Sequence, residues 1–378
     1  MKNIVLIPDK FKGTMSSAEI CAIMTKSITR FYPDAKIQSI PVADGGEGSV
    51  DAFLQAIGGQ KIFVAGVKGP YGKPMEGFYG ILPDGTAVME MAATSGFALV
   101  GEDKHPDRTT TFGVGQLMLD AARHGCKKII MGLGGSSTND GGCGCAAACG
   151  VTFLDKDGKK FVPVGETMHL VRDIDLSTMD PILHEVSVTA MCDIDNPFYG
   201  RNGAAYVFAP QKGADSRMVE TLDYNLVSLA GVIKDQLNLD IQSVPGSGAA
   251  GGMGGGMKAF FGATLQMGIE TILDAVHFDT LMEKADMVFT GEGKIDGQSL
   301  RGKVVIGVAR AAKRHHVPVM AIVGDIGDDV EGAYDEGVTG IFSINRLAIP
   351  YKESKLRAKG DMEKTMDNLM HVFSAFNV

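Results

Sequence analysis

The sequence predicts an α/β protein with two α/β domains: a Rossmann-like parallel-sheet domain formed by both chain ends, and a second, mixed α/β domain inserted into it. Three observations lead to this prediction. The chain has 378 residues, more than one hydrophobic core usually fills. Apolar runs of strand length alternate with helical patterns near the amino terminus, and this alternation returns near the carboxyl terminus. Between the two ends, hairpin-like pieces and long glycine-rich loops dominate.

The amino-terminal part predicts a βαβ unit. Residues 3–7 form an apolar run, residues 17–30 a helical pattern, and residues 36–41 a second apolar run. Ser16 and Glu19 have the spacing of a capping box, in which each side chain satisfies a free backbone N–H at the helix start. We therefore expect the loop before this helix to be held firmly.

The later parts of the chain complete the two domains. Three further buried strands are expected, at 287–290, 317–323 and 340–344, followed by a packing helix at about 351–376. The middle of the chain predicts a hairpin at 78–91 and a strand, loop and helix at 128–150. We place the first domain at residues 1–63 and 284–378, and the inserted domain at 64–283.

Composition excludes several classes of protein. The net charge of −9 is spread along the chain without a basic block, so neither nucleic acid nor a membrane is expected as a partner. The apolar stretch at the amino terminus is too short for a signal peptide, and no run could span a membrane. The six cysteines form neither a disulfide framework nor a zinc-site spacing. We expect a cytoplasmic monomer or homodimer.

The first candidate loop follows the first predicted strand. It has the sequence Asp9-Lys10-Phe11-Lys12-Gly13-Thr14 and leads into the capped helix. Loops at the carboxyl ends of parallel strands are where such folds bind ligands. Lys10 and Lys12 could therefore hold an anion beside the helix amino terminus. The alternative is that both are solvated loop lysines.

Two further glycine-rich loops follow predicted strands. In the loop at 44–49, a capping turn would need only one polar residue, which leaves others for a ligand or a metal ion. The loop at 132–142 combines hydroxyls, an amide, a carboxylate and bare backbone, as a phosphate cradle would; close packing of glycine backbone is the alternative. The predicted binding residues are Asp44, Gly45, Gly46, Glu47, Gly134, Gly135, Ser136, Ser137, Thr138, Asn139 and Asp140.

A carboxylate pair follows the strand-like run at 185–191. Asp193 could bind magnesium or act as general base, and Arg201 nearby could balance charge. An Asx turn before Pro197 is the alternative, more so for Asp195 than for Asp193.

The strongest single site signal is the connection at 291–303, after the predicted strand 287–290. It carries cations, carboxylates and glycines between a strand and a helix. The predicted site residues here are Gly291, Glu292, Gly293, Lys294, Asp296, Gln298, Ser299 and Lys303.

Two partial matches to nucleotide-binding motifs are rejected. Residues 297–303 match the first part of a P-loop, but Val304 stands where the magnesium-binding Ser or Thr should be. Residues 246–251 match G-x-G-x-x-G, yet no strong strand precedes them.

Taken in order, these loops resemble the bacterial glycerate kinases of the type 1 family over essentially the whole chain. The matching motifs are Asp9 to Gly13, Asp44 to Gly48, Gly134 to Gly142, Pro245 to Gly252, and Thr290 to Lys303. The resemblance implies phosphorylation of D-glycerate by ATP with Mg²⁺, and a two-domain fold with the active site in the interdomain cleft. The resemblance does not decide which hydroxyl is phosphorylated; we expect 2-phosphoglycerate, with 3-phosphoglycerate as the alternative.

Phosphoryl transfer needs backbone N–H groups around the phosphates, a metal ion, cations and a group that accepts the proton. We expect Asp193, Lys10 and Asp296 to be catalytic, with Asp193 as general base. Asp44 and Asp193 are the expected Mg²⁺ ligands. Two alternatives stay open at this point: a nicotinamide-dependent dehydrogenase of a small hydroxy acid, and a non-enzymatic two-domain solute-binding protein.

Overall fold

The computed structural model describes residues 1–43, 45–297 and 299–376, except for the side chain of Arg301. The predictions for Asp44 and Gln298 therefore lie outside the described residues. The chain forms two compact units, one made of Met1–Ala43 with Ile269–Val378 and the other of Asp44–Gly268. Each unit has its own sheet and its own buried apolar cluster. The sequence analysis placed the domain boundaries after residues 63 and 283. The compact units instead divide after Ala43 and after Gly268, earlier in the chain in both cases.

The first unit contains a parallel sheet with the strand order β16-β14-β12-β1-β2. The strands are β1 (Asn3–Pro8), β2 (Lys36–Ser39), β12 (Met287–Gly291), β14 (Val319–Val323) and β16 (Val338–Ser343). The chain passes from β1 to β2 on one side and resumes at β12 on the other side of β1. This reversal is a topological switch point, where open α/β sheets bind ligands beyond the carboxyl ends of the strands.

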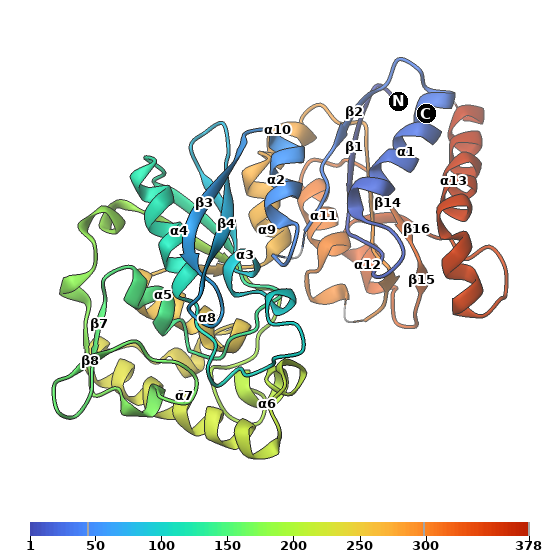
Figure 1. The fold of residues 1–378 in the computed structure, drawn as a ribbon. Helices are drawn as coiled ribbons and strands as arrows, with labels where there is room; N and C mark the ends of the chain where they lie inside the picture. Colours follow the sequence, from blue (N-terminus) through green and yellow to red (C-terminus); the bar gives the residue numbers. More distant parts are fainter. Residues whose placement is uncertain (44, 298, 377–378) are drawn as a thin grey trace. The chain divides into compact units, whose positions relative to one another are not determined.

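Helices cover both faces of this sheet. Helices α1 (Ser17–Phe31) and α13 (Tyr351–Ala375) lie side by side (Figure 1) and pack on the face that presents Leu6 and Phe289. Helix α11 (Val304–Lys313) packs on β1, β12 and β14 from the opposite face. Shorter elements of this unit are α9 (Gly268–Ala275), α10 (Phe278–Met282), α12 (Gly332–Asp335), β13 (Lys294–Ile295) and β15 (Asp325–Ile326).

The second unit contains a mixed sheet with the strand order β11-β10-β6-β5-β4-β3. Strands β5, β6, β10 and β11 are parallel, while β3 and β4 form an antiparallel hairpin that pairs with β5. The strands are β3 (Gln60–Lys68), β4 (Pro74–Ile81), β5 (Ala87–Glu90), β6 (Lys128–Gly132), β10 (Ser187–Met191) and β11 (Thr264–Gln266). A small separate sheet has the order β8-β7-β9, made of Lys160–Phe161, Thr152–Leu154 and Asp173–Asp175.

The helices of the second unit surround this mixed sheet (Figure 1). They are α2 (Ser49–Ile57), α3 (Ala92–Ser95), α4 (Phe112–Arg123), α5 (Cys143–Ala148), α6 (Ala204–Phe208), α7 (Ser216–Leu237) and α8 (Ala249–Phe261). Helix α2 packs on β4 and β5, which places it in this unit. The predicted fold class, a parallel sheet built from both chain ends with a mixed α/β insertion, is confirmed. Across the described residues, every helix is too short or too polar to cross a lipid bilayer.

One buried hydroxyl ties the start of α1 to the first sheet. Ser17 Oγ donates to Pro8 O at 2.5 Å and accepts from Val42 N at 2.9 Å. The predicted capping box is confirmed, because Ser16 Oγ accepts from Glu19 N while the Glu19 carboxylate accepts from Ser16 N. The loop that carries Lys10 is therefore anchored at both of its ends.

Replacing Ser17 with Ala should destabilise the first unit by about 1–3 kcal/mol, because a buried N–H and a buried carbonyl lose their partner. Urea unfolding followed by circular dichroism measures this change. Ser374→Ala on the exposed end of α13 is the matched control and should shift the free energy of unfolding by less than about 0.5 kcal/mol. Equal midpoints for Ser17→Ala and the unaltered chain would contradict the anchoring role.

Candidate functional site

In the first unit, the loops after β1 and β12 meet at the switch point of the sheet. Asp9 N donates to Gly291 O at 2.8 Å, directly beyond the paired strand ends Pro8 and Gly291. The loop after β14 joins them, since Asp325 N donates to Gly293 O at 3.1 Å. The sequence motifs at 9–13 and 291–303 therefore lie together at one sheet edge.

Glu292 is the buried acid of this edge. The residue is 6% exposed, Ser299 hydrogen-bonds to its carboxylate, and its Oε1 atom has no hydrogen-bond partner among the described residues. Burial raises the pKa of Glu292 to about 7, with Asp9 and Asp296 adding to the rise, while Ser299 and Lys303 oppose it. A carboxyl group with a pKa near neutrality can take up a proton and release it under physiological conditions.

The charged residues around Glu292 differ in exposure. Lys10 and Asp296 are half-buried, whereas Lys12, Lys294 and Lys303 are exposed. Lys294 Nζ lies 3.5 Å from the Asp296 carboxylate, so this pair partly neutralises itself. Lys303 occupies the N-cap position of α11 without a side-chain cap bond.

In the second unit, the loop that follows Asp44 packs against the end of β6. Gly134 N donates to Gly45 O at 2.9 Å, and a Cβ atom on Gly132 would lie 2.3 Å from Gly45 O. A Cβ atom on Gly134 would lie 2.7 Å from Gly46 Cα. Close backbone packing thus accounts for these glycines, as the alternative interpretation expected. Glu47 is exposed on the outer side of this contact.

The loop after β6 has an open end and a buried base. Gly134 is half-exposed, Gly135 is exposed, and Ser136 is 8% exposed. The residues from Ser137 to Asp140 are at most 2% exposed. Ser137 N and Oγ both donate to Ser95 O, each at 3.0 Å. The part of this loop that a ligand could reach is therefore Gly134 to Ser136.

Asp140 organises the base of the loop. It is fully buried, and its Oδ2 accepts hydrogen bonds from Thr111 N at 2.7 Å, Thr111 Oγ1 at 2.9 Å and Gly144 N at 3.3 Å. Its Oδ1 accepts from Gly142 N at 3.1 Å. Burial raises the pKa of Asp140, and these hydrogen bonds oppose the rise. The Asp140 carboxylate therefore holds the loop in shape through these hydrogen bonds, and its oxygens are not exposed at the surface.

Two residues of the loop base keep unpartnered polar atoms. Thr138 Oγ1 and both side-chain polar atoms of Asn139 are buried and find no hydrogen-bond partner in the described part of the chain, and both residues are 0% exposed. Buried polar atoms of this kind are usually satisfied by ordered water or by a ligand.

Lys212 lies beneath the same loop, and sequence reasoning missed it. It ends a short 3-10 helix (Pro210–Lys212), is 3% exposed, and its Nζ donates to Ser136 Oγ at 2.6 Å and to Thr138 O at 2.7 Å. Burial lowers the pKa of Lys212 to about 7, and the field of Asp140 opposes this decrease. Nothing in the local sequence marks this lysine, because its burial arises only from packing beneath a loop more than seventy residues earlier.

Asp193 lies at the carboxyl end of β10, as predicted. Its side chain is exposed, and Oδ1 accepts a hydrogen bond from Gly268 N at 2.7 Å. Arg201 is also exposed and stacks its guanidinium over the Tyr206 ring, 4.6 Å from the ring centre. The G-x-G-x-x-G match at 246–251 follows a 3-10 helix rather than a strand, which agrees with its rejection as a dinucleotide fingerprint.

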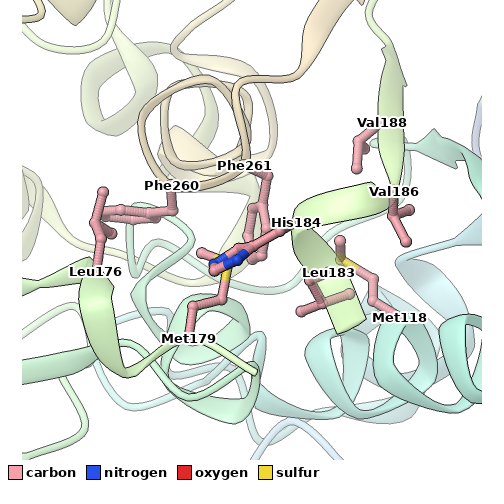
Figure 2. Close-up of a pocket in the computed structure, with 9 residues that line it drawn as sticks. All are labelled: Met118, Leu176, Met179, Leu183, His184, Val186, Val188, Phe260 and Phe261. Carbon is pink, nitrogen blue, oxygen red and sulfur yellow. The ribbon is translucent and has the colours of Figure 1, made fainter. Parts of the chain in front are cut away.

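A pocket of about 240 Å³ also lies in the second unit, at the amino end of β10. Figure 2 shows its lining, which is apolar apart from the imidazole of His184. The lining residues are Met118, Leu176, Met179, Leu183, His184, Val186, Val188, Phe260 and Phe261. No predicted site residue lines it, so it is separate from the loops at the carboxyl ends of the strands.

Known proteins match this arrangement along its whole length. The model of the glycerate kinase family matches residues 4–374. The chain belongs to the glycerate kinase family. It is 41% identical to the glycerate kinase of Halalkalibacterium halodurans, over 99% of both chains. It is 44% identical to the glycerate 2-kinase of Escherichia coli, over 90% of both chains.

A solved structure supports the same assignment. The fold matches a crystal structure described as glycerate kinase 2 from Salmonella typhimurium LT2, with a TM-score of 0.87 and 37% identity. The match covers 100% of this chain and 99% of that one. The predicted resemblance to glycerate kinases and the predicted enzyme class are therefore confirmed, and membership of a kinase family implies a nucleotide substrate and a small-molecule acceptor.

Among the described residues of this family member, no group of three or more His, Cys, Asp or Glu side chains is arranged to hold a metal ion. Magnesium in kinases usually keeps several waters and binds through one or two carboxylates together with the phosphates of the substrate. The exposed carboxylate of Asp193 at a strand end is compatible with that mode of binding.

The pKa of Glu292 predicts how stability depends on pH. Between the ordinary pKa of 4.5 and about 7 the folded state binds the proton more tightly than the unfolded state, so stability decreases as pH rises through this window. At pH 8, Glu292→Gln should be more stable than the unaltered chain by up to about 3 kcal/mol, and the difference should vanish near pH 4.

Denaturant midpoints at pH 4, 6 and 8 measure this difference. Glu185→Gln is the matched control, because Glu185 is exposed and pairs with Lys127. The control should show no gain at pH 8. A pH-independent difference between Glu292→Gln and the unaltered chain would contradict the proton assignment.

Proposed function

We propose that this chain transfers the γ-phosphoryl group of ATP to D-glycerate in the presence of Mg²⁺ and yields 2-phosphoglycerate. The observation that carries this proposal is the pairing of the 9–13 and 291–303 loops at a switch point, in a chain of the glycerate kinase family. The choice of the 2-product follows the E. coli relative, which is named glycerate 2-kinase. A cytoplasmic location belongs to the same proposal, as expected from a cysteine spacing that forms no disulfide framework.

In the first unit, the switch-point loops offer the groups that phosphoryl transfer needs. Lys10, Lys303 and the amino terminus of α11 supply positive charge for anionic oxygens. Glu292 supplies a buried carboxylate with a pKa of about 7 and one oxygen to which no described residue hydrogen-bonds. We assign Glu292 as the acceptor of the hydroxyl proton, a role for which the sequence alone favoured Asp193.

In the second unit, the open end of the glycine-rich loop and Asp193 form the other part of the proposed machinery. Gly135 and Ser136 offer backbone N–H groups and a hydroxyl to an oxyanion. Asp193 would hold Mg²⁺, which neutralises charge on the phosphate oxygens when bound. The expectations that Asp44 shares this role and that the site lies in an interdomain cleft stay predictions.

Product analysis tests the proposed reaction. Purified protein incubated with ATP, Mg²⁺ and D-glycerate should give the phosphorus NMR signal of 2-phosphoglycerate. Omission of Mg²⁺ and replacement of D- by L-glycerate are the control reactions. The signal of 3-phosphoglycerate would change only the assigned hydroxyl, whereas no phosphorylated product at all would overturn the proposed function.

Variants of the two carboxylates separate their roles. Glu292→Gln should lower kcat by about 10²- to 10⁴-fold and remove the acidic limb of the pH–rate profile, because the proton acceptor is lost. Asp193→Asn should instead raise the Mg²⁺ concentration needed for half-maximal rate and retain that limb. Steady-state rates from pH 5 to pH 9 at several Mg²⁺ concentrations give both readouts. Exchanged phenotypes would return the base role to Asp193.

A further inference from the structure

Lys212 is a buried lysine that forms no ion pair with any residue that the structure describes. The residue is 3% exposed, and among the described residues no carboxylate oxygen lies within 4.0 Å of its ammonium group. Its two hydrogen-bond acceptors, Ser136 Oγ and Thr138 O, are neutral atoms of the glycine-rich loop. A buried charge without a counterion is expensive, so its presence calls for a compensating group.

The surrounding charges do not supply that group. Asp140 contributes a field that favours the ammonium form, but its oxygens are occupied by Thr111, Gly142 and Gly144. The region around Lys212 is thus short of negative charge.

Ser136 connects the buried ammonium with the open end of the loop. Because Nζ donates to Ser136 Oγ, the Ser136 hydroxyl keeps its own proton for donation to another group. Ser136 is 8% exposed and follows the exposed Gly135, whereas Lys212 lies below. A charged donor behind a hydroxyl strengthens the hydrogen bond that the hydroxyl can donate.

We propose that Lys212 is a positioning residue that turns the Ser136 hydroxyl toward an oxyanion of the bound substrate and supplies its countercharge from beneath the loop. This inference rests on the proposed function, since both substrates carry oxyanions: the carboxylate of glycerate and the phosphates of ATP. The titration of Lys212 near pH 7 is consistent with the geometry, because a nearby anion would drive proton uptake.

Lys212→Met tests the proposal, because methionine has a similar length and no charge. We expect kcat/KM for the substrate whose oxyanion meets Ser136 to decrease by about 10- to 100-fold. Determining KM for D-glycerate and for ATP separately identifies that substrate. The melting temperature at pH 6.5 should be unchanged or higher, since the variant no longer buries an unpaired charge. Lys234→Met, at an exposed position of α7, is the matched control and should leave every readout unchanged.

A second pair of measurements shows whether Lys212 acts through Ser136. The double variant Lys212→Met/Ser136→Ala should lose about as much kcat/KM as the more damaging single variant, because both changes remove the same interaction. Calorimetric titration with D-glycerate alone and with ATP alone, at pH 7.5 in HEPES and in Tris, measures proton uptake. For the unaltered chain, binding of one of these two ligands should be accompanied by proton uptake. This proton uptake should be absent in Lys212→Met.

The outcomes distinguish this inference from the proposed function. If the unaltered chain phosphorylates glycerate and Lys212→Met retains kcat/KM within twofold, the role of Lys212 is overturned. A lowered melting temperature with proportionate loss of active protein would show a merely structural lysine and also overturn it. If Lys212→Met does not fold, Ser136→Ala decides, since unchanged kcat/KM in that variant contradicts the proposal. Absence of glycerate phosphorylation by the unaltered chain refutes the proposed function instead.

Discussion

The candidate site of the second unit depends on one buried carboxylate. Asp140 draws the backbone of Thr111 at the start of α4 and the backbone of Gly142 and Gly144 at the start of α5 onto its two oxygens. The bonds leave no room for side chains, since a Cβ atom on Gly144 would lie 2.2 Å from Thr110 Oγ1. The glycines and Asp140 therefore act together: without side chains, the glycines let the backbone come close to Asp140, and the carboxylate stabilises that close packing by accepting hydrogen bonds.

In each unit, burial shifts the pKa of one side chain to about 7, upward for an acid in the first unit and downward for a base in the second. In the first unit, an acid is withdrawn from water, and the pKa of Glu292 rises to about 7. In the second, a base is withdrawn, and the pKa of Lys212 decreases to about 7. Desolvation disfavours the charged form in both cases. Groups with such perturbed pKa values cluster at functional sites.

Much of the fold could be predicted from the sequence because its signals are local. The strand at 3–7, the capping box at Ser16 and the turn between β4 and β5 each follow from neighbouring residues. The sequence also placed the candidate loops directly after predicted strands, but it did not show which loops share a sheet edge: the loop at 45–49 was expected in the first domain and packs against β6 in the second unit. The sequence could not show which loop residues are accessible, because Asp140 and Ser136 differ only in what packs around them. It also could not mark Lys212, whose partners are distant in the chain.

The position of β1 in its sheet has a consequence for synthesis. Strand β1 pairs with β2 on one side and with β12 on the other. The pairing of Ile4 with Met287 can form only after Met287 has left the ribosome. The whole second unit, Asp44–Gly268, is made in that interval and contains its own core. Until then β1 presents an apolar, unpaired strand edge of the kind that promotes aggregation. The nascent chain should therefore need chaperone protection early, and its inserted unit should fold before the unit that was begun first.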